Sequence, residues 1–156
     1  MSLISKAKSN GAAEVKQALQ NLTDRRAYYT ERIEEITACY SLSAWAPSAV
    51  PKGKSSSFRR LETGAALVIE AKAELAKVDE TIKSYIRVLQ DHADEVRNAS
   101  EKIRLMKLRF LDGREWSNVA YQLYGENADY MTCSKTYMRR MFRLYDSACH
   151  DIWNYW

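Results

Sequence analysis

The scarcity of residues that interrupt a helix is the feature that most constrains how this chain can fold. The 156 residues include only 5 glycines and 2 prolines, and both prolines lie within residues 45–58, next to a run of serines. Elsewhere apolar residues recur at intervals of three and four, which is the period of one face of an α-helix. The sequence therefore predicts an all-α protein that is interrupted by one loop at residues 45–58 and by a few glycines.

Two long apolar stripes flank this loop, one over residues 12–44 and one from Arg60 to about Asn98. At 1.5 Å per residue, the second helix would be about 57 Å long, which is typical of a coiled coil or a bundle arm. Two such helices joined by one loop most simply form a long antiparallel hairpin. Because two helices cannot cover each other on every side, we expect the chains to associate as a homodimer or a higher oligomer. The stripes consist of Val15, Leu19, Leu22, Tyr29, Ile33, Ile36 and Tyr40, and of Leu61, Ala65, Val68, Leu75, Val78, Ile82, Ile86, Leu89, Ala93 and Val96.

Three shorter amphipathic segments follow the long stripes. Ser100 is a candidate cap for the first segment, which Gly113 closes, and Gly125 closes the second. Glycine often ends a helix because it can adopt the left-handed conformation. The third segment runs from about Ser134 toward Trp153. The sequence thus predicts two domains, a hairpin and oligomerisation arm over residues 12–98 and a compact trihelical unit over residues 100–156.

Positive charge is concentrated in the trihelical region. The whole chain carries a net charge of +4, whereas residues 102–143 contain nine basic and four acidic side chains, a surplus of five positive charges. A helix-turn-helix places its second helix in the major groove of DNA, so that helix needs an apolar inner face and hydrogen-bond donors on its outer face. The last predicted helix meets both requirements. Its apolar residues are Met138, Met141, Phe142, Tyr145, Ala148 and Ile152, and the candidate DNA-binding residues are Lys135, Thr136, Arg139, Arg140 and Arg143, with Arg114 on the preceding helix.

The candidate residues divide by their place along the last helix. Residues near the N-terminus of a recognition helix reach base edges, whereas contacts to phosphates provide affinity without sequence information. We therefore expect Lys135, Thr136 and Arg139 to lie nearest the bases, and Arg140 and Arg143 to lean toward phosphates.

The stretch KLRFLDGREWSNVAYQLYG, residues 107–125, resembles the helix-turn-helix of sigma-70 region 4 as found in small phage and prophage proteins. That family shares the pattern LRYLDG, a short polar stretch, a tryptophan and xxIAxxL. The hairpin region also resembles this family, which is akin to the ArpU and RinA types of late-gene transcriptional regulator. One departure is the turn YGENADYMTC, which is several residues longer than the family's usual turn and bears on how the recognition helix is oriented. The matching core residues are Trp116, Val119, Ala120 and Leu123, followed by Ser134, Met138 and Met141.

The resemblance implies a phage or prophage transcriptional regulator that binds double-stranded DNA sequence-specifically in the cytoplasm of the bacterial host. Two alternatives remain open. The chain could be an assembly or DNA-packaging component akin to a small terminase subunit, or an interaction protein that binds RNA polymerase without touching DNA.

Other chemistry finds no support in the sequence. His92 and His150 have no second ligand at metal spacing, and the three cysteines are odd in number and widely scattered. The motif Gly53-Lys54-Ser55 lacks the earlier glycine of a phosphate-binding loop, because that position is Ser48. No run of residues is apolar enough to span a membrane. We therefore expect a non-enzymatic protein without metal, cofactor or membrane contact, whose aromatic C-terminal residues pack against the trihelical unit or the long helices.

Overall fold

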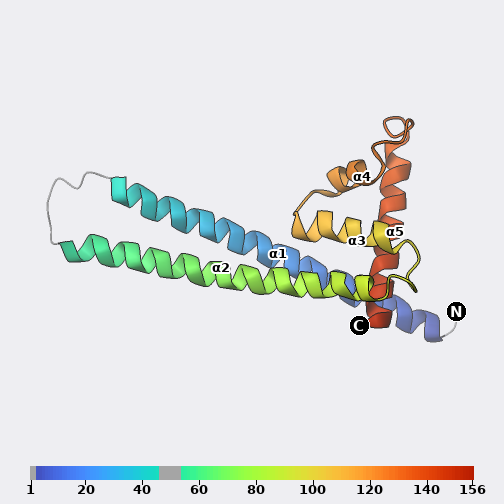
Figure 1. Cartoon of the computed structure of the whole chain (residues 1–156), viewed down its shortest axis with the longest axis horizontal. Helices are drawn as coiled ribbons and strands as arrows, with labels where there is room; N and C mark the ends of the chain where they lie inside the picture. The colour runs from blue at the N-terminus through green and yellow to red at the C-terminus, as the bar shows by residue number, and fades with distance from the viewer. Residues whose placement is uncertain (1–2, 46–53) are drawn as a thin grey trace. The chain divides into compact units, whose positions relative to one another are not determined.

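A computed structural model describes the backbone of residues 3–45 and 54–156, and the side chains of residues 10–40 and 62–156. Within these residues all regular structure is helical and no strand occurs, which confirms the all-α class (Figure 1). None of the described helices combines the length and the apolar character that a membrane span requires. The elements are α1 (Leu3–Trp45), α2 (Lys54–Asp91), α3 (Ala99–Met106), the π-helical turn η1 (Lys107–Leu111), α4 (Trp116–Tyr124) and α5 (Ser134–Tyr155).

Packing divides the chain into two compact units. The first unit combines the residues up to Thr23 with Glu80–Trp156, and the second unit is Asp24–Asp79. The N-terminal part of α1 and the C-terminal part of α2 therefore pack with the three short helices. The functional boundary near residue 99 that the sequence suggests stays a prediction.

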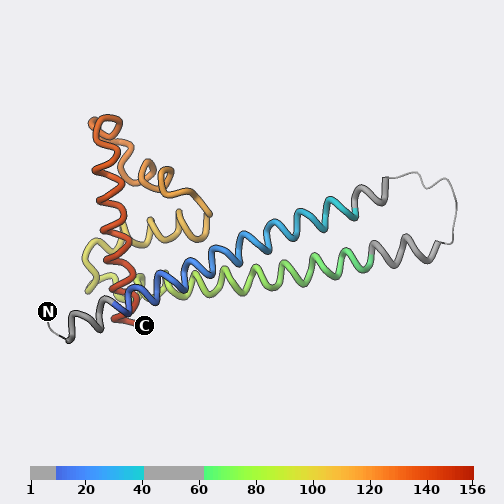
Figure 2. Tube along the Cα trace, turned by 180° about the vertical axis from the view of Figure 1, so that it is seen from behind, coloured from blue at the N-terminus to red at the C-terminus, as the bar shows by residue number. Residues whose placement is uncertain are grey.

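In the second unit, α1 and α2 lie side by side and run in opposite directions (Figures 1 and 2). Ile36 of α1 and Val78 of α2 are buried. Arg26, which interrupts the apolar stripe of α1, donates from Nε to Oδ1 of Asp79 on α2 at 2.8 Å. The ring of Tyr40 lies so close to Gly64 that a Cβ at this glycine would be 2.5 Å from the ring, which explains why a glycine stands inside a long helix.

The core of the first unit draws on all five helices. Each fully buried aliphatic side chain contributes roughly 1.5–3 kcal/mol relative to an exposed one. The members without measurable exposure include Leu19 of α1, Ile82 and Leu89 of α2, Leu105 and Met106 of α3, Val119 of α4, and Met141 and Ile152 of α5.

The second long helix begins and ends earlier than the sequence predicts. It starts at Lys54 rather than Arg60, so residues 54–58 of the predicted loop are helical, while residues 46–53 lie outside the described part. It ends at Asp91 rather than near Asn98, and residues 92–98 form turns. The amide of His92, the first residue after α2, still donates to the carbonyl of Val88 at 3.2 Å. Its ring stacks on that of Tyr155 of α5, with ring centroids 4.4 Å apart.

Two predicted helix signals act differently in the structure. Ser100 is not a cap but lies inside α3, and the cap is Asn98, which adopts the left-handed conformation with φ 55°. Asparagine tolerates this conformation better than most residues. Gly113 is left-handed with φ 68°, as expected for a glycine that closes a helix. Gly125 follows α4 with an ordinary φ of −62°, so its conformational freedom is not used there.

An ion pair in the core fixes α3 against α5. Nζ of Lys102 lies 2.5 Å from Oδ2 of Asp151, and the side chains are 3% and 21% exposed. Sequence alone assigns Lys102 to the basic surface, because the spacing of residues does not reveal its distant partner. An ammonium group taken out of water requires such a partner, so the pair sets the register of the two helices.

We expect Asp151→Ala to lower the free energy of unfolding by about 3 kcal/mol. The substitution leaves the ammonium of Lys102 buried without a counter-charge, and breaking a buried pair costs about 3–5 kcal/mol, with the lower end applying because Asp151 is partly exposed. Urea unfolding followed by circular dichroism measures the change.

Asp146→Ala on the same helix is the matched control. Asp146 pairs with Lys16 at the surface, where the two side chains are 55% and 39% exposed, and we expect a loss below about 1 kcal/mol. Equal losses in the two variants would show that the Lys102 pair is not the stronger constraint.

Candidate nucleic-acid interface

The helix α5 presents two opposite faces along its 22 residues. One face carries the buried residues Met141, Leu144, Ala148, Cys149 and Ile152, which pack toward the rest of the first unit. Near the helix N-terminus the opposite face carries Lys135, Arg139 and Arg143, which follow one another at intervals of four. Burial of the first face therefore dictates that the second face points to solvent.

All six predicted DNA-binding residues are exposed, but they differ in whether another side chain contacts them. Lys135, Arg139 and Arg143 form no ion pair or hydrogen bond with another described side chain. By contrast, the guanidinium of Arg140 lies over the ring of Tyr124, 5.2 Å from its centroid. Arg114 donates from Nη1 to Oδ1 of Asn118 at 3.1 Å.

Two of the basic residues between 102 and 143 do not belong to the surface charge. Lys102 is buried in its pair with Asp151, and Arg109 is half-buried. Its Nη1 donates to the carbonyl oxygen of Arg114 at 2.8 Å, and its guanidinium lies 4.8 Å from the centroid of the Trp116 ring. Arg109 thus spans the Gly113 turn rather than facing solvent. Seven exposed basic residues remain, namely Arg104, Lys107, Arg114, Lys135, Arg139, Arg140 and Arg143.

An aromatic cluster holds the N-terminus of α4 against α5. Ring centroids of Phe110, Phe142 and Tyr145 lie 6.2, 5.3 and 5.0 Å from that of Trp116. Trp116 therefore packs between helices, as the sequence indicates. Phe142, which the sequence assigns to the apolar face, is 39% exposed, and its ring lies beside that of Trp116 at an interplanar angle of 57°.

The long turn over residues 125–133 is held by a chain of short-range hydrogen bonds. The amide of Gly125 donates to the carbonyl of Tyr121, that of Asn127 to Tyr124, that of Tyr130 to Asn127 and that of Cys133 to Asp129, at 2.7–3.0 Å. The side chain of Asn127 also donates to the carbonyl of Tyr124. The additional length of this turn is therefore organised as successive tight turns.

Four tyrosines fix this turn between α4 and α5, and sequence reasoning missed them. Tyr130 is 8% exposed, and its ring centroid lies 5.7 Å from that of Tyr121 and 5.5 Å from that of Tyr137. Tyr124 and Tyr137 lie 5.4 Å apart. The hydroxyl of Tyr137 donates to Oδ1 of Asp129 at 2.6 Å, which raises the pKa of the phenol. The repeated tyrosines on both sides of the turn were the available signal.

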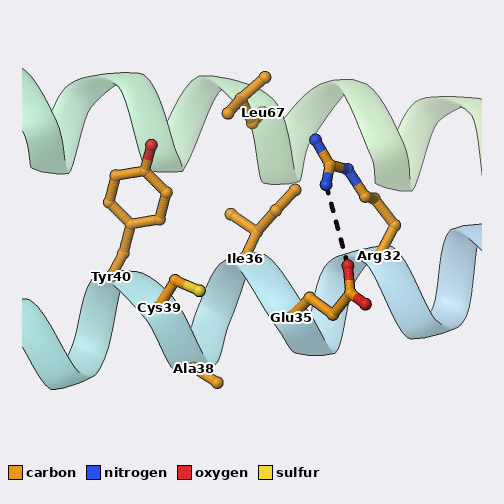
Figure 3. A pocket seen from close by; sticks show the side chains of 7 residues that line it. All are labelled: Arg32, Glu35, Ile36, Ala38, Cys39, Tyr40 and Leu67. Carbon is orange, nitrogen blue, oxygen red and sulfur yellow. Dashed lines mark ion pairs between the residues drawn. The ribbon is translucent and has the colours of Figure 1, made fainter.

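The other chemically interesting groups are inert or scattered. Burial raises the pKa of the Cys149 thiol to about 12. Within the described residues, no three His, Cys, Asp or Glu side chains gather where they could hold a metal ion. A pocket of about 690 Å³ in the second unit is lined by Cys39 and Tyr40, with Leu67 on the facing helix (Figure 3). Among its described lining residues one ion pair joins Arg32 and Glu35 at 3.8 Å, and no histidine accompanies the Cys39 thiol.

We expect Tyr137→Phe to increase the rate of amide hydrogen exchange across residues 125–133. The substitution removes the hydrogen bond to Asp129 and leaves the ring packing in place. Mass spectrometry of peptides that cover this turn measures the rate, and Tyr28→Phe, at an exposed position in α1, is the control. Unchanged exchange in Tyr137→Phe would indicate that ring packing alone holds the turn.

We expect the three thiols to react in the order of their exposure. At pH 8 iodoacetamide should alkylate the exposed Cys39 quickly and Cys149 only on unfolding, because the raised pKa leaves almost no thiolate at Cys149 and burial blocks access. Peptide mass spectrometry distinguishes the sites. Alkylation of folded Cys149 at the rate of Cys39 would contradict this part of the structure.

Comparison with known proteins adds no relative, since no protein-family model, curated protein or solved structure matches the chain. The basic face of α5, and the packing that holds it, are therefore the observations from which a function can be inferred.

Proposed function

We propose that the chain binds double-stranded DNA through the exposed basic face of α5 and regulates transcription in the cytoplasm of a bacterial host of phage or prophage. The observation that supports DNA binding best is the row Lys135, Arg139 and Arg143, which stands opposite the buried face of α5 and meets no acidic partner among the side chains that the structure describes. The row ends at Asp146, which pairs with Lys16. Unneutralised cations in a row on a rigid helix suit a polyanion.

The dimensions of α5 agree with those of the major groove. A helix with its side chains is about 10–12 Å across, and the major groove of B-DNA is about 12 Å wide. Eight residues separate Lys135 from Arg143, so the row extends about 12 Å along the helix axis. In this proposal α3, α4 and α5 act as a helix-turn-helix unit, in which α4 braces the phosphate backbone and α5 enters the groove.

The contacts of individual residues refine the expected roles. Lys135 and Arg139 lie near the N-terminus of α5 and are free to reach base edges, with Thr136 beside them. Arg140 is held over Tyr124, so it contributes positive charge at the α4 side of the interface rather than reading a base. Arg114 donates a hydrogen bond to Asn118 on α4, and in this proposal its guanidinium contacts a phosphate.

The proposed regulatory role rests on the sequence resemblance, and the proposed oligomeric state rests on exposed apolar side chains. The resemblance of residues 107–125 to sigma-70 region 4 favours transcription over other uses of DNA. The long antiparallel helices expose apolar side chains, among them Tyr28 and Ile69 with exposed fractions of 59% and 68%. This exposure supports a coiled-coil-like hairpin that pairs with a second copy, and a dimer suits the two half-sites of a regulatory DNA sequence.

Changing Arg139, Arg140 and Arg143 together to alanine should weaken duplex binding by about 100-fold or more, because each contact is worth about 1–3 kcal/mol. The slope of log affinity against log salt should also fall by about 2, since the two phosphates expected at Arg140 and Arg143 lose their partners. Fluorescence anisotropy with a duplex enriched from fragmented phage DNA measures both quantities. Native affinity of the triple variant at physiological salt would show that α5 is not a recognition helix.

A variant with Arg25, Lys72 and Arg87 changed to alanine is the matched control. These three exposed basic residues lie on α1 and α2, and the change removes the same charge while leaving α5 intact. Sequencing of the enriched fragments separates the alternatives. A promoter-like site favours regulation, a packaging site favours the terminase-like role, and no enriched site favours a protein partner such as RNA polymerase.

A further inference from the structure

The C-terminal end of α5 forms a small aromatic pocket with α1 and α2, apart from the basic face. The pocket has a volume of about 230 Å³, and all of its lining residues belong to the first unit. Val15 and Ile152, 5% and 0% exposed, form an aliphatic floor. The remaining lining residues are Glu14 and Ala18 of α1, Tyr85 of α2, and Trp153 and Trp156 at the end of α5.

The aromatic rings of this pocket are fixed in place. Trp156 stacks on Tyr85 with ring centroids 4.7 Å apart and an interplanar angle of 30°. A Cβ added to Gly11 would lie 2.3–2.4 Å from three atoms of the Trp153 indole, so one face of that ring rests on the backbone of α1. Rings held in this way lose little conformational freedom when a ligand binds.

The tryptophans are held but not buried. Trp153 is 44% exposed and Trp156 is 68% exposed, whereas Ile152 in the same helical turn is fully buried. Packing within the chain accounts for the buried face of each ring, and the exposed face remains available to a ligand. Glu14, which lies one turn after Gly11 on α1, is exposed and forms no ion pair with another described side chain.

We propose that this pocket binds a soft organic cation, either an alkylated ammonium or a guanidinium group. The negative faces of aromatic rings attract weakly hydrated cations, and a nearby carboxylate adds a full opposite charge. The aliphatic floor accepts the methyl or methylene groups that accompany such a charge. An anion would face Glu14 and the ring faces, which repel it. This proposal does not depend on DNA binding.

Fluorine NMR of the full chain labelled with 5-fluorotryptophan tests the proposal directly. The chain contains four tryptophans, and Trp153→Phe and Trp156→Phe variants assign the two resonances of the pocket. We expect choline to shift these two resonances in a saturable way at millimolar concentration and to leave the Trp116 resonance unchanged. The neutral isostere 3,3-dimethylbutan-1-ol has the same shape without the charge, and we expect it to produce no saturable shift.

Two further arms distinguish the source of the cation and the role of the carboxylate. N-acetylarginine amide in place of choline tests whether the guanidinium of a protein side chain is the better occupant, and the tighter of the two cations identifies the ligand class. Glu14→Gln should weaken the tighter cation about fivefold, the effect of losing one favourable contact. Glu31→Gln, an exposed position on the same helix in the second unit, should have no effect.

The outcomes that overturn the proposal are equally definite. Absence of saturable shifts with both cations, or equal binding of choline and its neutral isostere, would show that the pocket recognises no charge. Native affinity in Glu14→Gln together with unchanged shifts in Trp156→Ala would show that the cation binds elsewhere. Circular dichroism of each variant separates loss of binding from loss of fold.

Discussion

The first unit depends on the amphipathic character of α5, which has one buried apolar face and one exposed basic face. Met141 and Ile152 must be buried, and because they lie on one stripe of a straight helix, their burial also fixes the direction of every other side chain on it. The ion pair between Lys102 and Asp151 adds a constraint that apolar packing cannot supply, since a shift of α3 along α5 would separate the charges inside the core. The basic face is therefore a consequence of the core.

The turn over residues 125–133 shows how an added length of chain can remain rigid. A long loop before a helix would ordinarily let that helix change its angle. Here Tyr130 and Tyr137 pack against each other, and Asp129 accepts a hydrogen bond from the Tyr137 hydroxyl, so that the loop closes on the helix that follows it. The orientation of α5 relative to α4 is thus defined by side-chain packing rather than by the shortness of the turn.

The sequence reveals the elements but not their distant partners. Periodicity and scarce glycine are properties of neighbouring residues, so the all-α class and most helix positions could be predicted from them. The role of Lys102 and the placement of Arg140 over Tyr124 each depend on a residue far along the chain or across a turn. A count of charges treats all lysines and arginines alike. It therefore includes Lys102 and Arg109, although Lys102 is buried and Arg109 is half-buried.

The two ends of α5 differ in chemistry, and one straight helix joins them. The N-terminal part carries free cations, and the C-terminal part carries tryptophans held by α1 and α2. No glycine or proline interrupts α5, so it has no hinge within its length. If the basic end binds DNA as proposed, a ligand at the aromatic end changes that affinity only by moving α5 as a whole against α3. That movement is opposed by the Lys102–Asp151 pair, because Asp151 directly precedes the pocket residue Ile152 on α5. On the two proposals, the ends therefore bind independently while this pair is intact, and coupling between them requires that it break.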